Sequence, residues 1–316
     1  MRFTVIGEAL VDLVQSREDA RFAAHPGGSA FNVAITLGRL GDRVVFAGQR
    51  GTDGFGELLS AKLLGSGVRP DHWRTLALPS SLAVAALDHG GQAHYSFYFD
   101  GTAGLAFDAL GPLPAADVVH AGSIASWLPP AAGFVQGVLR SARASGTTLV
   151  SYDPNVRPAL LADRAATTAE IERCIALAHV VKASDEDLAT LHPGEPVDAV
   201  AARWCALGAT LVVVTRGADG AVAFGPGGEL ARRPAPRITV ADTVGAGDSF
   251  AGALLSALAE TELAAPADLA RAVETRDGRL EQVLRVAVAV SAITCQRAGA
   301  DPPTRAELDA YLSRRD

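Results

Sequence analysis

The chain reads Asp242-Thr243-Val244-Gly245-Ala246-Gly247-Asp248-Ser249-Phe250-Ala251-Gly252 where a β-branched stretch, Ile238 to Val240, gives way to an apolar helical run, Phe250 to Ala259. Because glycine leaves the backbone unshielded, the N–H groups of residues 245–248 can converge on an anion at the N-terminus of the predicted helix. The helix dipole stabilises an acidic side chain in that first turn, here Asp248. Beside a bound phosphate, such a carboxylate can accept a proton from an attacking hydroxyl. Taken alone, the stretch is also explained by an N-capping aspartate after a flexible turn.

Composition limits the class of protein. The 316 residues are 49% hydrophobic and 20% charged, with a formal net charge of −7, as in an ordinary globular protein of one large domain or two. The negative charge argues against a nucleic-acid or anionic-membrane partner. The two lysines, Lys62 and Lys182, do not follow a glycine at the Walker A spacing, so a phosphate site is expected to rely on backbone N–H groups and arginine.

Cysteine and histidine usage excludes other sites. The three cysteines form no C-x-x-C pair and the seven histidines form no H-x-x-x-H pair, so neither a disulfide framework nor a zinc site is expected. The apolar start of the chain is too short for a signal peptide, and no run reaches transmembrane length. These features predict a cytoplasmic protein.

Strand-like apolar runs alternate with helical segments, the pattern of a mostly parallel sheet with helices on both faces. Strands are expected at Phe3–Ile6, Val44–Ala47, Val118–Ala121, Thr148–Tyr152, Val180–Lys182, Leu211–Thr215 and Ala221–Phe224. Helices are expected at Ser29–Leu40, Gly54–Leu64, Pro129–Ala144, Thr168–Ala178, Glu186–Leu191, Val197–Leu207, Ser249–Ala259 and Leu280–Gln296. Ligands of such sheets bind at the carboxyl ends of the strands.

One segment breaks this rhythm and predicts a β-hairpin. It comprises Ser81–Leu87, a turn Asp88-His89-Gly90-Gly91, and Ala93–Phe99, whose alternating aromatic residues share one face. It is either an edge hairpin of the main sheet or a lid across a cleft. A basic stretch, Arg232–Arg237, is expected to be a solvated connector.

A second glycine motif lies near the N-terminus. Pro26-Gly27-Gly28-Ser29-Ala30-Phe31-Asn32-Val33-Ala34 runs from a glycine pair into a predicted helix, and Asp12 lies just beyond the first strand. The small residues allow close approach of a polyhydroxylated ligand, and the Asp12 carboxylate and Asn32 amide suit its hydroxyl groups. A glycine pair before a helix is also a common turn.

The glycine pair with Asn32, followed by Gly38 and Gly41, and the Asp242–Asp248 segment together resemble the two signatures of the ribokinase/PfkB carbohydrate kinases, in the right order and separation. The resemblance implies one α/β domain over residues 1–316, with a mostly parallel central sheet and helices on both faces. It also implies a small β-hairpin lid, formed mainly by about residues 81–103, with about 12–25 as a further part. The implied activity is transfer of a phosphoryl group from ATP to a sugar with the help of Mg²⁺.

The same resemblance implies residue roles. Asp248 would be the catalytic base, and the N–H groups of Gly245, Ala246 and Gly247 would form the anion hole. The sugar would be bound by Asp12, Gly27, Gly28, Asn32, Phe97, Asn155, Arg157 and Asp248. The segment Thr215-Arg216-Gly217-Ala218-Asp219-Gly220 resembles the nucleotide loop, where a plain β-turn is the alternative, and Arg216 would add charge near the phosphates. ATP would contact Lys182, Ser184, Thr215, Arg216, Gly217, Gly220 and Gly247.

The cation sites depart from the family pattern or leave little trace. Ser184 and Asp187 stand where the family carries N-x-x-E, so Glu186 or Asp187 would orient Mg²⁺-bound water. A capped helix start with a solvated acidic face explains either residue equally well. A potassium ion would lie near Asp242, Val244 and Gly299.

The choice of sugar depends on Asp153-Pro154-Asn155-Val156-Arg157-Pro158, which resembles fructokinases and 2-keto-3-deoxygluconate kinases. A loop held by two prolines, with Asp153 as its anchor, is the structural alternative. The lid offers Phe99 and Asp100 where the ketodeoxygluconate kinases carry an arginine, and an acidic residue would repel a sugar acid. We therefore expect fructose, with ketodeoxygluconate, ribose or a nucleoside as alternatives, and a catalytically silent sugar- or nucleotide-binding regulator as the other class. A homodimer with clasped lids is expected, although a monomer is also allowed.

Overall fold

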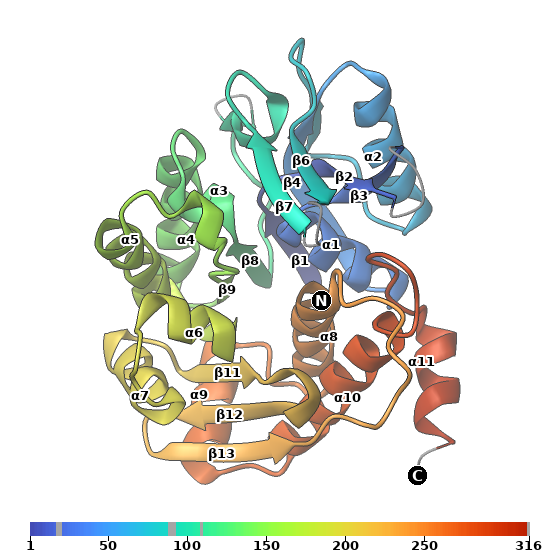
Figure 1. The fold of residues 1–316 in the computed structure, drawn as a ribbon. Helices are drawn as coiled ribbons and strands as arrows, with labels where there is room; N and C mark the ends of the chain where they lie inside the picture. The colour runs from blue at the N-terminus through green and yellow to red at the C-terminus, as the bar shows by residue number, and fades with distance from the viewer. Residues whose placement is uncertain (17–20, 88–92, 108–109, 315–316) are drawn as a thin grey trace.

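The structure is a computed structural model that describes residues 1–16, 21–87, 93–107 and 110–314. A nine-stranded sheet runs through the molecule in the order β13-β12-β11-β10-β9-β8-β1-β4-β5 (Figure 1). Its strands are β1 (Arg2–Ile6), β4 (Arg43–Arg50), β5 (Trp73–Thr75), β8 (Val118–Gly122), β9 (Leu149–Asp153), β10 (Val180–Ser184), β11 (Leu211–Thr215), β12 (Ala221–Gly225) and β13 (Gly228–Arg233). Neighbours from β11 to β5 are parallel, whereas β12 and β13 are antiparallel additions at one edge.

Helices cover both faces of this sheet, because successive residues of each strand point to opposite sides. On β11, for example, Leu211 and Val213 belong to one hydrophobic cluster, while Val212 and Val214 belong to the other. The first cluster includes residues of α1 (Ser29–Arg39), α2 (Gly54–Gly65), α8 (Ala246–Glu260), α9 (Pro266–Thr275), α10 (Arg279–Thr294) and α11 (Arg305–Leu312). The second includes residues of α3 (Ile124–Trp127), α4 (Ala131–Ala144), α5 (Arg164–Leu177), α6 (Asp185–Leu191) and α7 (Val197–Leu207). This is the expected α/β fold with a mostly parallel sheet.

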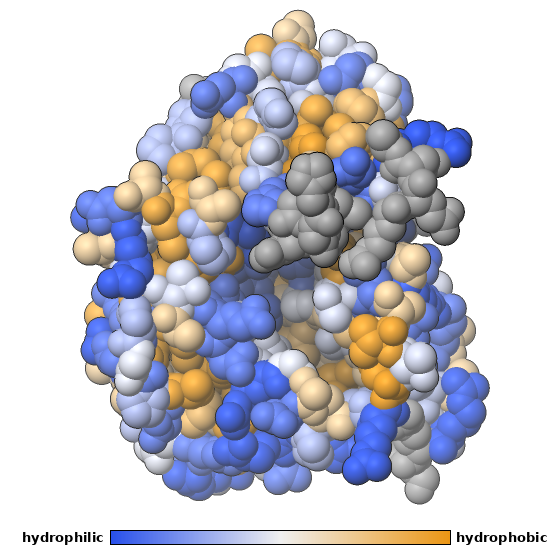
Figure 2. All heavy atoms as spheres, in the orientation of Figure 1, coloured by the Kyte–Doolittle hydropathy of each residue, from blue (hydrophilic) through white to orange (hydrophobic). Residues whose placement is uncertain are grey.

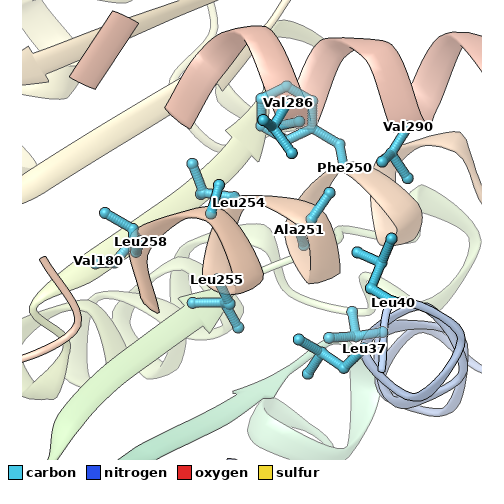
Figure 3. Packing of buried hydrophobic residues seen from close by; sticks show 14 of the residues in the cluster. Leu37, Leu40, Val180, Phe250, Ala251, Leu254, Leu255, Leu258, Val286 and Val290 are labelled. Carbon is cyan, nitrogen blue, oxygen red and sulfur yellow. The ribbon is translucent and has the colours of Figure 1, made fainter. Parts of the chain in front are cut away.

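Helix α8, which begins in the glycine-rich stretch, lies in the middle of the first cluster. Figure 3 shows Phe250, Leu254 and Leu258 of α8 among side chains of α1, α10 and β10. Gly252 permits this packing, since a Cβ built there would lie 2.7 Å from the Thr36 Cβ of α1. The N-terminus of α8 is thereby fixed against the N-terminal third of the chain.

The predicted hairpin is found, but in a second sheet. Strands β6 (Leu82–Leu87) and β7 (Ala93–Tyr98) pair with β2 (Leu10–Gln15) and β3 (Phe22–Gly27) in the order β3-β2-β6-β7, at the top of Figure 1. The interpretation as an edge hairpin of the main sheet is therefore wrong. The predicted turn at Asp88–Gly91 lies outside the described residues. We call these four strands the lid sheet.

Other differences have local causes. Helix α5 begins at Arg164 rather than Thr168, because the Asp163 side chain accepts a hydrogen bond from the Ala166 N–H and caps it. The basic stretch Arg232–Arg237 is a connector only in part, since its first two residues belong to β13, which pairs with β12. The span of about 12–25, expected as a further part of the lid, overlaps β2 and β3 of the lid sheet. The sequence-based prediction missed β5, β13, α3, α9 and α11, each of ten residues or fewer. The β-branched stretch from Ile238 to Val240 forms no strand.

Candidate active site

A cleft of about 1420 Å³ opens at the carboxyl ends of the parallel strands, between the lid sheet and the start of α8. Figure 2 shows a hollow in the middle of this face of the molecule, with hydrophilic residues along its lower rim. Most of the predicted site residues line this cleft: Asp12, Gly28, Asn32, Phe97, Asn155, Arg157, Lys182, Ser184, Glu186, Asp187, Thr215, Gly217, Gly220, Asp242, Val244, Gly245, Ala246, Gly247, Asp248 and Gly299. Gly27 and Arg216 are not among its lining residues.

Asp248 lies in the first turn of α8 and is 8% exposed. One carboxylate oxygen accepts a hydrogen bond from the Ser29 hydroxyl (2.7 Å), and the other accepts one from the Asn32 amide (2.8 Å). Both donors come from α1, which the glycine pair precedes. The two sequence motifs therefore meet at one carboxylate, whose orientation is fixed by two neutral donors.

The backbone before Asp248 presents N–H groups to the cleft. Gly245 is the N-cap of α8 with φ 73°, a left-handed conformation that favours glycine, and a Cβ there would lie 2.5 Å from that of Ala300. The Ala246 N–H donates to the Thr243 carbonyl (3.2 Å), so it closes the turn. Within the described residues, the N–H groups of Gly245, Gly247 and Asp248 have no such partner. Of the predicted set 245–247, the Ala246 N–H is therefore already hydrogen-bonded, and it is not available to a ligand unless this turn opens.

Lys182 approaches the same backbone. Its side chain is buried, and its ammonium lies 3.0 Å from the position of a Cβ built on Gly247. The ammonium donates to the Asp153 carboxylate at 2.9 Å. Burial lowers the pKa of Lys182, but the charges of Asp153, Asp187 and Asp248 outweigh it and raise the pKa overall, so the lysine is protonated. The ammonium therefore lies beside the Gly247 backbone, where the family resemblance places Lys182 among the expected ATP contacts, whereas composition alone suggests backbone N–H groups and arginine.

Asp12, on β2 of the lid sheet, lies on the opposite wall. Burial is the main cause that raises the pKa of Asp12 to about 6. The positive charge of Arg157 lowers this pKa, and the negative charge of Asp248 raises it. Gly27 pairs with Leu10 of β2 in the next strand, and a Cβ built on it would lie 2.2 Å from an Asp12 oxygen. The absence of a side chain at Gly27 is what lets the Asp12 carboxylate lie across β3. Phe97 of β7 is half-buried and stacks between Tyr95 and Phe99.

The loop after β9 carries the other polar groups of this wall. Asn155 adopts φ 37°, its amide oxygen accepts from Arg157 (2.7 Å), and its buried amide nitrogen has no partner within the described residues. The Asp153 carboxylate accepts the Asn155 N–H (3.1 Å), which confirms its interpretation as the anchor of the loop. Burial raises the pKa of Asp153 to about 6, although Lys182 opposes that shift. An orphaned donor held in a left-handed conformation is typical of a ligand-binding position.

The two acidic residues proposed for Mg²⁺ at the start of α6 differ in their contacts: Asp187 is hydrogen-bonded and buried, whereas Glu186 is exposed. Asp187 forms a capping box with Ser184, since its carboxylate accepts the Ser184 N–H (2.8 Å) and hydroxyl (2.7 Å). Its other oxygen accepts the Val156 N–H (2.8 Å), so Asp187 also anchors the loop after β9. Glu186 is exposed and lines the cleft. Of the two candidates, Glu186 has the free carboxylate.

The predicted potassium residues lie together. One Asp242 oxygen accepts the Val244 N–H (3.0 Å) and the other accepts the Gly299 N–H (2.8 Å). This carboxylate therefore joins the segment before α8 to the loop after α10. Among the described residues, no group of three or more His, Cys, Asp or Glu side chains could hold a metal ion.

The predicted nucleotide loop follows β11 as a short turn. The Arg216 N–H donates to the Gly220 carbonyl (2.7 Å), and Gly220 has φ 87° with no room for a Cβ beside the Arg233 carbonyl. Thr215, Gly217 and Gly220 line the cleft, and Arg216 does not. The positive charge of Arg216 instead helps to lower the pKa of Glu229 on β13. The expectation that Arg216 adds charge to the cleft is not met.

One buried carboxylate of the cleft was not among the predicted site residues. Glu8 is 2% exposed, lines the cleft, and accepts the Ser29 and Ala125 N–H groups at 3.2 and 3.3 Å. Its position immediately after a predicted strand was the one sequence signal for a place in the cleft. The contacts themselves could not be predicted, because Ser29 and Ala125 are distant from Glu8 in sequence.

Comparison with known proteins agrees with this geometry. The family model described as pfkB family carbohydrate kinase matches residues 2–307. A fructokinase from Rhizobium leguminosarum bv. trifolii is 38% identical over 259 residues, which cover 80% of this chain and 78% of that protein. The crystal structure of a Xylella fastidiosa fructokinase with bound ATP has a TM-score of 0.90 at 29% identity and covers 99% of this chain and 98% of that one. A Vibrio cholerae O395 fructokinase double mutant, in a form with fructose, ADP and potassium ion bound, has a TM-score of 0.83 at 27% identity, and the match covers 98% of both chains.

A family match over nearly the whole chain defines the class: this is a carbohydrate kinase of the ribokinase-like α/β fold. The chain belongs to the PfkB family, and the fructokinase from Rhizobium leguminosarum bv. trifolii is one of its relatives. No helix in the described part of the chain combines the length and apolarity needed to span a bilayer.

Proposed function

We propose that the protein transfers the γ-phosphoryl group of ATP to the primary hydroxyl of fructose, giving fructose 6-phosphate and ADP. The observation that carries the proposal is the meeting of Asp248, free backbone N–H groups and the Lys182 ammonium at one end of the cleft. The fructose-bound form of the Vibrio cholerae relative and the ATP-bound form of the Xylella relative support both ligands.

In this mechanism Asp248 accepts the proton of the attacking sugar hydroxyl. The hydroxyl oxygen forms a bond to the γ-phosphorus while the bond between that phosphorus and the ADP oxygen breaks. Ser29 and Asn32 hold the carboxylate in place. The N–H groups of residues 245, 247 and 248, with Lys182, stabilise charge on the transferring phosphoryl oxygens. Asp12, Asn155 and Arg157 bind the sugar hydroxyls, and Thr215, Gly217 and Gly220 contact the nucleotide.

The residues present fit Mg²⁺ and K⁺. Mg²⁺ usually keeps several waters and binds substrate phosphates with one or two carboxylates, which matches a single free carboxylate at Glu186. When bound, it neutralises phosphate charge. K⁺ would be held near Asp242 by carbonyl groups of Val244 and Gly299, and the potassium-bound relative supports this placement.

The lid sheet supports two further proposals. Its aromatic face, with Tyr95 and Phe97 lining the cleft, closes over the sugar and excludes water. Exposed apolar residues on the same sheet would pair lids in a homodimer: Val14, Phe22, Tyr95 and Tyr98. Asp100 is exposed beyond the end of β7 and is not among the residues that line the cleft, so the choice of fructose over a sugar acid depends on the fructokinase relatives.

A substrate panel with Asp248→Asn as control tests the function. Fructose is expected to give the highest kcat/KM over 2-keto-3-deoxygluconate, ribose and adenosine, and Asp248→Asn is expected to lower kcat about 10²- to 10⁴-fold. Preference for the sugar acid would overturn the choice of fructose. Binding without phosphoryl transfer to any of the panel would instead indicate a silent regulator.

A further inference from the structure

Glu8 occupies the turn between β1 and β2, at the floor of the cleft. Its two oxygens accept separate backbone N–H groups, that of Ser29 at the start of α1 (3.2 Å) and that of Ala125 in α3 (3.3 Å). The Ser123 side chain also hydrogen-bonds to it. Within the described residues, no cation pairs with this buried carboxylate, whereas the equally buried Asp153 has Lys182.

Both helices lack a cap of their own. The N-cap of α1 is Gly28, which has no side chain, and the N-cap of α3 is Ser123, whose side chain does not cap its helix. Helix N-termini leave N–H groups without partners and favour a negative charge. Glu8, which is distant from both helices in sequence, therefore supplies the hydrogen-bond acceptor that the N-cap residues of α1 and α3 do not provide.

The two helices belong to opposite walls of the site. On one side, the Ser29 hydroxyl donates to Asp248. On the other, the Ser123 N–H donates to the Asp153 carbonyl (2.8 Å) and Trp127 of α3 donates to the Pro154 carbonyl (3.3 Å). These two carbonyls precede Asn155 directly. One carboxylate thus bonds to both the wall that holds Asp248 and the wall that carries Asn155.

We infer that Glu8 is a positioning residue for phosphoryl transfer, which sets the separation between Asp248 and the loop that binds the sugar. The inference rests on the proposed role of Asp248. A misplacement of about 1 Å between reacting groups can lower a rate about 100-fold, so a residue that touches neither substrate can still control kcat.

The charge state of Glu8 matters because three donors point at it. Burial raises its pKa to about 7, opposed by the hydrogen bonds from Ala125, Ser123 and Ser29. The other ionisable groups around the cleft floor are Asp12 on β2, Asp248 on α8 and the Asp153–Lys182 pair on β9 and β10, and none of them contributes to this shift. Only the ionised form accepts with both oxygens, so kcat should rise as the pH passes upward through about 7.

Glu8→Gln is the direct test, because the amide keeps one acceptor and turns a donor toward the other N–H group. We expect kcat to fall about 10- to 100-fold, with the KM for fructose and ATP changed less than threefold and the rise of kcat near pH 7 lost. Glu8→Asp, one methylene shorter, should retain that rise and recover part of kcat. Asp163→Ala, which removes the cap of the distant α5, should lower the melting temperature and leave kcat unchanged.

A double-mutant cycle with Ser29→Ala separates positioning from general stability. If Glu8 acts through Ser29, the double variant loses less activity than the product of the two single losses. Independent losses, an unchanged kcat in a folded Glu8→Gln variant, or a raised KM for fructose alone would each overturn the inference. Full activity of Asp248→Asn would instead overturn the role of the base, and is therefore distinguishable.

Discussion

The pairing of Lys182 with Asp153 leads to a sharp prediction about stability. The side chains of Lys182 and Asp153 are 6% and 0% exposed, so Lys182→Met leaves a buried carboxylate without its counter-charge. Removing one partner of a buried ion pair costs about 3–5 kcal/mol of unfolding free energy. The chain provides its own control, because its other lysine, Lys62, pairs with Asp301 at 3.6 Å with 31% of the Lys62 side chain exposed. Lys62→Met should cost less than about 1 kcal/mol.

The cost at Lys182 should depend on pH in a defined direction. Without the ammonium, the pKa of Asp153 in the folded state rises further above its value of about 6 in the intact pair. A carboxyl whose pKa is higher in the folded than in the unfolded state favours folding below its unfolded pKa and loses that contribution as the pH rises through the folded pKa. The penalty of Lys182→Met should therefore be small near pH 4 and grow by up to about 1.4 kcal/mol per pH unit toward pH 8.

Urea denaturation of the wild type, Lys182→Met and Lys62→Met at pH 5 and pH 8 measures these differences. Asp153→Asn in the Lys182→Met background should recover much of the loss at pH 8, because it removes the unpaired charge. A penalty that is below 1 kcal/mol, or that does not change with pH, would show that Asp153 is not held as an anion by Lys182. The reasoning on the buried pair would then be wrong.

Three further changes test the site. Asp12→Asn should stabilise the fold by about 1–3 kcal/mol at pH 8 but not at pH 4, because burial raises the pKa of Asp12. The same substitution should raise the KM for fructose. Unfolding curves and kinetics at both pH values check the two effects. Asp187→Ala should lower the unfolding free energy by about 1–3 kcal/mol, because it removes the cap of α6 and the hydrogen bond from the Val156 N–H. Glu186→Ala should leave stability unchanged and raise the Mg²⁺ concentration needed for half-maximal rate. The opposite pattern would show that Asp187, and not Glu186, acts on the metal ion. Gly247→Ala should lower kcat at least tenfold without unfolding the protein, since its Cβ would meet only the Lys182 ammonium, and an unchanged kcat would exclude this backbone from the phosphate site.

The features visible in the sequence were those that depend on local spacing. Continuous apolar runs predicted seven of the nine strands of the main sheet, because buried parallel strands are apolar on both faces, whereas the edge strands β5 and β13 were missed. The Gly245–Asp248 spacing predicted a helix start with an acidic first turn, and the structure has one. The aromatic alternation predicted a hairpin, although not the sheet to which it belongs, since that depends on pairing β6 with β2 about seventy residues earlier.

The features that were missed depend on tertiary contacts. The Ala246 N–H donates to Thr243 in a turn, and Arg216 is not among the residues that line the cleft; neither residue type nor spacing reveals these placements. Lys182 was expected near the nucleotide from the family resemblance, but its buried ion pair with Asp153 depends on the packing of β9 against β10 and was not predicted. Glu8 bonds to a residue 117 positions away, and a single glutamate after a strand carries no signal for that.

The bonds from Ser29 and Asn32 to Asp248 span 219 and 216 residues. Contacts this distant in sequence form late, because a large loop must close before they contribute. During synthesis, the first wall of the site leaves the ribosome long before the helix that bears Asp248, so a partly made chain contains no assembled reaction centre. Completion of the fold and onset of phosphoryl transfer are therefore one event, and C-terminally truncated chains should be inactive even where their N-terminal strands are paired.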